Sequence, residues 1–106
     1  MDEGIKDLRR RRVRELLVPD GSPVGVPGRS RTGTVRVLPG GKEAADEIFA
    51  RLVEIGDVEE AGRYPGRYVS LGGEERAGLR GSSLSGEPTI DVRISYVPEI
   101  TKIKFE

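Results

Sequence analysis

The clearest pattern of hydrophobic positions lies between Lys42 and Ile55. Apolar residues recur there at the three- and four-residue spacing of one helix face, namely at Ala45, Ile48, Phe49, Leu52 and Val53. Glu43 and Glu47 stand near the amino end, where the helix dipole favours negative charge. The pattern predicts a helix over residues 42–55, ended by Gly56 in the C′ position that favours glycine.

The second half of the chain alternates between apolar and polar positions in short runs separated by turn residues. Residues 89–95 alternate strictly, so their apolar side chains share one face of a strand and their polar side chains the other. The same reasoning predicts strands at residues 34–38, 67–71, 76–80, 89–95 and 100–106, with 67–80 forming a hairpin. We therefore expect an α+β fold in which one main helix packs on a four-stranded antiparallel sheet, with a short strand ahead of the helix.

The first thirty residues show a weaker pattern. Residues 2–17 carry an irregular apolar stripe that is interrupted by four arginines at Arg9–Arg12, which predicts a weak, loosely docked helix. Residues 18–30 contain Pro19, Pro23 and Pro27 among several glycines, a composition typical of linkers. The chain is accordingly divided into an N-terminal Arg-rich segment with a Pro/Gly linker at 1–30 and a compact domain at 31–106.

Composition then restricts the chemistry. The 106 residues include no Cys and no His, and 18 basic residues balance 18 acidic ones. Disulfides, thiolate chemistry, histidine-based triads and the usual zinc sites are therefore excluded. No apolar run approaches the length of a membrane span. Any reaction must rest on Arg, Lys, Tyr, Ser, Thr, Asp and Glu, and we expect neither a metal nor a cofactor.

The polar side of the predicted sheet is where these residue types gather. They are Arg80, Thr89, Asp91, Arg93, Lys102 and Lys104, preceded in the loop by Ser83 and Ser85. Cations and hydroxyls on adjacent strands can bind a phosphodiester and stabilise its developing charge. The same alternation is also typical of any half-exposed sheet that faces solvent. Tyr68 is suited either to stacking on a base or to the rim of the core, and Arg9–Arg12 either to RNA contact or to solubility.

Several stretches of the chain resemble a known family. They are RVLPGGKEAADEIF (36–49), YPGRYVSL (64–71), LRGSSLSGEPTIDV (79–92) and ITKIKF (100–105). Over about residues 33–106 the chain is similar to the C-terminal toxin modules of bacterial polymorphic and contact-dependent toxins, within the barnase–EndoU–colicin–RelE-like ribonuclease group. The resemblance implies a compact domain that cleaves RNA, often tRNA, without metal. The positions that match its motif, and which it implies are catalytic, are Arg80, Ser83, Ser85, Thr89 and Asp91.

Two functions remain open at this point. In the first, the chain is a ribonuclease toxin, secreted as part of a larger protein, monomeric when free, acting in the cytoplasm of a target cell and neutralised by a cognate immunity protein. Its catalytic residues would then be accompanied by substrate-binding residues at Tyr68, Arg93, Lys102 and Lys104. In the second, the chain is a non-enzymatic module that binds a protein partner through the sheet face or an edge strand.

Overall fold

Two helices and a mixed β-sheet make up the protein. The computed structural model describes the chain except for residues 1, 30–32, 57, 61–65 and 82–85. The helices are α1 (Asp2–Leu17) and α2 (Gly41–Ile55), with a 3₁₀ turn at Pro19–Gly21. The strands are β1 (Val26–Pro27), β2 (Val35–Leu38), β3 (Val58–Glu60), β4 (Arg67–Ser70), β5 (Arg76–Arg80), β6 (Thr89–Arg93) and β7 (Lys102–Phe105). The predicted α+β class is confirmed.

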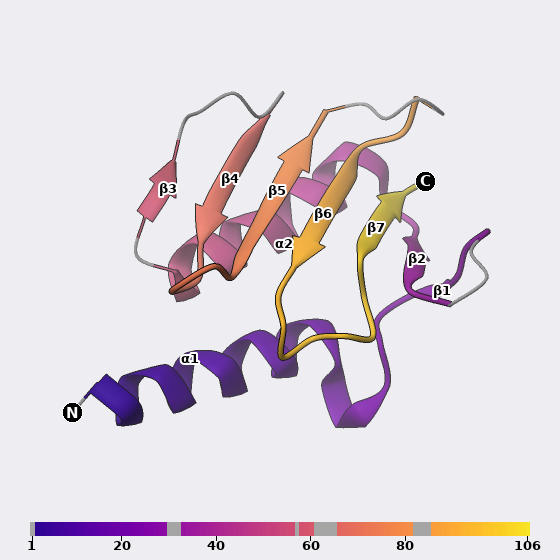
Figure 1. The fold of residues 1–106 in the computed structure, drawn as a ribbon. Coiled ribbons are helices and arrows are strands. Elements are labelled where there is room, and N and C mark those ends of the chain that lie inside the picture. The colour runs from indigo at the N-terminus through magenta and orange to yellow at the C-terminus, as the bar shows by residue number, and fades with distance from the viewer. Residues whose placement is uncertain (1, 30–32, 57, 61–65, 82–85) are drawn as a thin grey trace.

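The sheet is larger than the sequence indicated, so the predicted four-stranded antiparallel sheet is wrong in detail. Its strands lie in the order β1-β2-β7-β6-β5-β4-β3 (Figure 1). The β4–β5 hairpin and the β5–β6 and β6–β7 pairs are antiparallel as expected. However, β2 pairs in parallel with β7, and β3 adds to the outer side of β4. The β2–β7 pairing joins segments so distant in sequence that no local hydrophobic period predicts it, and β3 is only three residues long.

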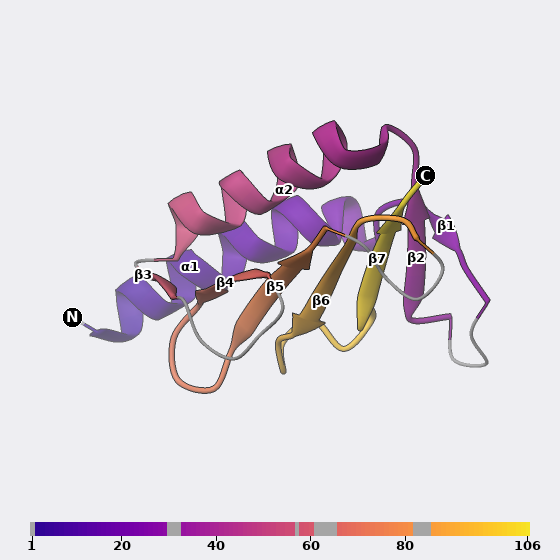
Figure 2. The same ribbon diagram turned by 90° about the horizontal axis from the view of Figure 1, so that it is seen from above.

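Helix α2 covers one face of the sheet and leaves the other face open (Figure 2). The predicted apolar stripe is confirmed, because Ala45, Phe49 and Leu52 are fully buried in the core. The sheet contributes the predicted inward-facing side chains of β6 and β7 to the same core, including Ile90 and Ile103. We refer to the opposite side of β4–β7, which carries the polar residues of these strands, as the outer face.

Gly56 ends α2 as predicted, but it is the C-cap with an extended backbone, not the left-handed residue typical of the C′ position. Its backbone is extended, with φ −81° and ψ 163°. A Cβ at this position would lie 2.5 Å from the carbonyl oxygen of Ser70 and 2.8 Å from a methyl group of Val69. The glycine therefore lets the end of α2 approach strand β4 closely.

Helix α1 is firmly packed, which corrects the expected loosely docked helix. It runs across the end of the strands where β6 leads into β7 (Figure 1), and its Val13 and Leu17 are fully buried. Arg14 donates hydrogen bonds to the carbonyl oxygen of Tyr96 and to both carboxylate oxygens of Glu99, in the β6–β7 connection. The apolar stripe is sparse, but these contacts come from distant segments that a helical period does not reveal.

The proline- and glycine-rich segment after α1 pairs with the sheet. Val24 donates its N–H to the carbonyl of Leu17, and β1 pairs antiparallel with β2. The Arg36 side chain of β2 donates to the carbonyls of Val24 and Gly25 at 3.0 and 2.9 Å. Segments on both sides of the expected boundary at residue 31 therefore share one sheet and one core.

Candidate phosphate-binding face

The strand register brings the predicted site residues together on the outer face. Arg80, Thr89 and Lys104 stand opposite one another across β5, β6 and β7. The next outward-facing row places Asp91 opposite Lys102. Residues in adjacent rows of one sheet face are close enough for long side chains to interact. The arrangement can therefore gather guanidinium, ammonium and carboxylate groups at one place.

Arg80 and Asp91 form an ion pair that is largely shielded from solvent. Arg80 Nη2 donates to Asp91 Oδ1 at 3.2 Å, and Arg80 Nε lies 2.8 Å from Oδ2. The second contact brings the charges together without the angle of a hydrogen bond, so Nε is left without a hydrogen-bond acceptor among the residues that the structure describes. The two side chains are 23% and 19% exposed, respectively. Asp91 thus fixes the direction in which the Arg80 guanidinium points.

Thr89 lies between Arg80 and Lys104 in the first row, but it does not present its hydroxyl to solvent. The residue is fully buried, and its Oγ1 donates to the carbonyl oxygen of Glu87 at 3.3 Å. The Glu87 carboxylate in turn lies 3.6 Å from Lys104 Nζ. Thr89 is therefore placed to hold the start of β6, while Lys104 and Glu87 form the charged rim above it.

Three cations at the other end of the outer face have no such compensation. Arg76 on β5 stands directly opposite Arg93 on β6, and Lys102 lies on the neighbouring strand β7. All three side chains are exposed, and within the described part of the chain none has an ion-pair partner. Like charges placed directly opposite on antiparallel strands repel each other. Arg76 was missed in the sequence, because its position opposite Arg93 depends on the register between β5 and β6.

Tyr68 lies on the same face, at its β4 edge. It stands opposite Gly78, in the row that continues to Asp91, and is half-buried. A shallow hollow of about 180 Å³ runs beside it and is lined by Ser70, Glu75 and Arg76 as well as Tyr68. Ser83 and Ser85, the remaining predicted site residues, lie outside the described residues.

The described ranges also show no metal-binding cluster and no membrane-crossing helix. They contain no group of three or more His, Cys, Asp or Glu side chains that could hold a metal ion. Neither α1 nor α2 combines the length and apolar character that a membrane-crossing helix needs.

Comparison of the chain with protein-family models, with curated proteins and with solved structures gave no match. A function for this chain is therefore inferred from the geometry of the outer face.

Proposed function

We propose that the outer face binds the sugar–phosphate backbone of RNA and that the chain is a metal-independent ribonuclease. The observation that carries the proposal is the pairing of Arg76 with Arg93, with Lys102 on the next strand, all exposed and without ion-pair partners among the described residues. Opposing like charges cost roughly 0.2–1 kcal/mol in a folded sheet. An anion bound between the two guanidinium groups offsets this cost, because each can donate a fork of N–H groups to phosphate oxygens.

The ion pairs at the other end of the face suit a catalytic role. Because Asp91 holds Arg80 in one orientation, the unused N–H groups of Arg80 are directed before substrate arrives. Preorganised donors of this kind stabilise the charge that develops on a phosphate in the transition state. Lys104 supplies a second cation at the same end, on the strand next to β6. Asp91 is a positioning residue in this scheme.

The reaction that fits these groups is attack by the ribose 2′-hydroxyl of the substrate on its adjacent phosphorus. The 2′-oxygen forms a bond to phosphorus, the bond from phosphorus to the 5′-oxygen of the next nucleotide breaks, and a cyclic phosphate results. We place the Glu87 carboxylate, at the rim beside Lys104, as the acceptor of the 2′-hydroxyl proton. The leaving 5′-oxygen takes a proton from water and becomes a hydroxyl group. Tyr68 is proposed to stack on a base.

The biological setting is part of the same proposal and comes from the resemblance to secreted toxin modules. The chain would be delivered as part of a larger secreted toxin and would cleave RNA, such as tRNA, in the cytoplasm of the target cell. When free it would be a monomer, and a cognate immunity protein would cover the outer face. An acidic surface on that protein would complement the exposed Arg76, Arg93 and Lys102.

The test is binding and cleavage of a single-stranded RNA at several salt concentrations. Phosphate contacts make affinity fall with salt, with a slope of roughly 0.7 per contact for single strands. The Arg76→Gln/Arg93→Gln variant should lose about two such contacts and bind at least about tenfold more weakly. The matched control is Arg51→Gln, because Arg51 is also exposed but lies on α2. Equal affinity and slope in both variants and the original chain would refute the proposal.

A protein-interaction module is the second candidate, and one observation favours it. Val26 in edge strand β1 is 60% exposed, although it is a large hydrophobic residue. Edge strands are templates for strand addition by a partner. A chain with this function alone would show no salt-dependent affinity for RNA.

A further inference from the structure

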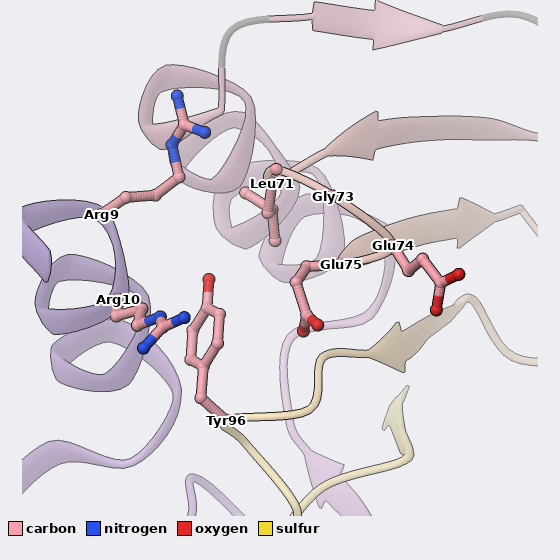
Figure 3. A pocket seen from close by; sticks show the side chains of 8 residues that line it. Arg9, Arg10, Leu71, Gly73, Glu74, Glu75 and Tyr96 are labelled. Atoms are coloured by element: carbon pink, nitrogen blue, oxygen red, sulfur yellow. The ribbon is translucent and has the colours of Figure 1, made fainter. Parts of the chain in front are cut away.

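A second hollow, lined by both polar and apolar groups, lies between α1 and the turn that joins β4 to β5 (Figure 3), next to the Tyr68 hollow, with which it shares Gly73 and Glu75. It has a volume of about 200 Å³, several times the roughly 30 Å³ that one water occupies. Arg9, Arg10 and Tyr96 line it together with Glu75 and the Gly72–Gly73 turn. Arg9 and Arg10, two of the four arginines that interrupt the apolar stripe of α1, thus face this hollow.

The Tyr96 hydroxyl in this hollow has no hydrogen-bond partner. Its oxygen is shielded from solvent, and no acceptor for it exists among the residues that the structure describes. Burial raises the pKa of Tyr96, and the nearby Glu75 charge raises it further. The hydroxyl therefore stays protonated and is a hydrogen-bond donor. Buried donors in proteins are almost always paired, so this hydroxyl is available to an acceptor that enters the hollow.

Two guanidinium groups approach the same place from α1. The Arg10 guanidinium lies over the Tyr96 ring, 5.5 Å from its centre. Gly72 makes room for Arg9, since a Cβ at that position would lie 3.0 Å from Arg9 Nη1. Figure 3 shows the Tyr96 hydroxyl pointing toward the side of the hollow where Arg9 lies, with the Arg10 guanidinium beside the Tyr96 ring. Two planar forks and a neutral hydroxyl form a donor set that matches the oxygens of a phosphate group.

Two acidic residues, Glu74 and Glu75, also line this hollow. The Glu75 carboxylate accepts hydrogen bonds from the Ser95 hydroxyl, at 2.7 Å, and from the Ser95 backbone N–H. Both Glu75 carboxylate oxygens therefore already accept a hydrogen bond from Ser95. Glu74 points away from both arginines (Figure 3).

We propose that this hollow binds the oxyanion of a phosphate group, held by Arg9, Arg10 and the Tyr96 hydroxyl. Because the hydroxyl is shielded in the free protein, Arg10 moves off the Tyr96 ring to admit the anion. Arg10 is exposed on α1, so its side chain can change rotamer without disturbing the core. These three donors fit free phosphate and the terminal phosphate of an oligonucleotide equally well. The site does not depend on the function proposed for the outer face.

The experiment measures the rise in melting temperature with inorganic phosphate, against sodium chloride at the same ionic strength. A ligand that binds only the folded chain stabilises it in proportion to the logarithm of its concentration. Tyr96→Phe removes only the hydroxyl and should weaken phosphate binding about tenfold or more. Arg10→Gln should weaken it similarly, whereas Arg11→Gln removes the same charge from an exposed neighbour and should not. Equal phosphate effects in all three variants, or equal effects of phosphate and chloride, would overturn the proposal.

A second arm separates the two sources of phosphate. A short oligonucleotide is compared with and without a 5′-phosphate, in the original chain and in Tyr96→Phe. A gain in affinity from the 5′-phosphate that disappears in Tyr96→Phe supports recognition of an RNA end. If neither oligonucleotide displaces bound inorganic phosphate, the result supports a site for free phosphate. Tyr96→Phe should melt no lower than the original chain without ligand, because it removes a buried unpaired donor.

Discussion

Arg14 and Glu99 hold helix α1 against the connection between β6 and β7. Nη1 donates to Oε1 at 3.0 Å and Nη2 to Oε2 at 2.7 Å, a two-bond arrangement between residues 85 positions apart in the sequence. The same Nη1 donates to the carbonyl oxygen of Tyr96 at 2.7 Å. The pair therefore connects the N-terminal helix to the loop that carries the Tyr96 hollow.

The first prediction concerns the acid stability of this connection. The Arg14 hydrogen bonds lower the pKa of Glu99 below its usual value near 4.5. The folded state therefore favours the charged carboxylate more than the unfolded chain does. The stabilisation is complete above the usual value and is lost as pH falls through the lowered pKa. Between pH 7 and pH 3 the melting temperature of the original chain should fall more than that of Glu99→Gln.

The control for this measurement is Glu47→Gln. Glu47 is exposed and lies 3.7 Å from Arg51 in a one-turn pair on α2, where ion pairs contribute little. Its melting temperature should follow that of the original chain across the pH range. Identical pH profiles for Glu99→Gln and the original chain would contradict the proposed contribution of the Arg14–Glu99 pair.

The second prediction tests whether α1 belongs to the core. Leu17 is fully buried, and truncating a buried leucine to alanine costs about 2–5 kcal/mol of unfolding free energy. Leu8 on the same helix is 52% exposed, so Leu8→Ala should change stability by less than about 0.5 kcal/mol. Urea unfolding of both variants measures the difference. Similar small losses in the two variants would mean that α1 is not part of the cooperative unit.

The third prediction separates binding from stability at the Arg76–Arg93 pair. Arg76→Gln relieves the opposing charges, so the free energy of unfolding should stay the same or rise by up to about 1 kcal/mol. RNA affinity should fall in the same variant. Denaturant titration and RNA binding, measured on one preparation, report the two effects. A loss of stability in Arg76→Gln would show that the guanidinium has a structural partner.

The fourth prediction distinguishes the catalytic and structural parts of the Arg80–Asp91 pair. Arg80→Ala removes the Arg80 contacts of the Asp91 carboxylate, which is largely shielded from solvent. The free energy of unfolding should fall by roughly 1–3 kcal/mol. RNA cleavage should be lost as well. Adding Asp91→Asn removes the remaining charge and should restore part of the stability without restoring cleavage. Melting temperature and cleavage rate are measured for the single and double variants. Cleavage at the original rate in Arg80→Ala would remove Arg80 from the proposed reaction.

Local pattern was sufficient to predict some of the fold. The α2 stripe and the alternation in β6 and β7 follow directly from helix and strand periods, and Phe49, Ile90 and Ile103 are buried as those periods require. The docking of α1 and the parallel β2–β7 pairing did not follow, because both depend on contacts between distant segments. In the sequence, Val13 and Leu17 belong to a sparse apolar stripe. Their full burial in the core is evident only in the folded structure.

The candidate site was predictable to the same extent. Arg80, Asp91 and Lys104 could be placed on one face because strand alternation is a local property, and the structure places them there. The Arg80–Asp91 pair itself required the register between strands. The Tyr96 hollow could not be predicted, because α1, the β4–β5 turn and the β6–β7 connection each contribute only part of it.

The position of β7 in the interior of the sheet has a consequence for biosynthesis. This strand leaves the ribosome after the other six, yet it lies between β2 and β6. Until it emerges, the nascent polypeptide holds two incomplete sheet fragments whose inner edges are unpaired and open to aggregation. Completion of the sheet must therefore await translation of Phe105.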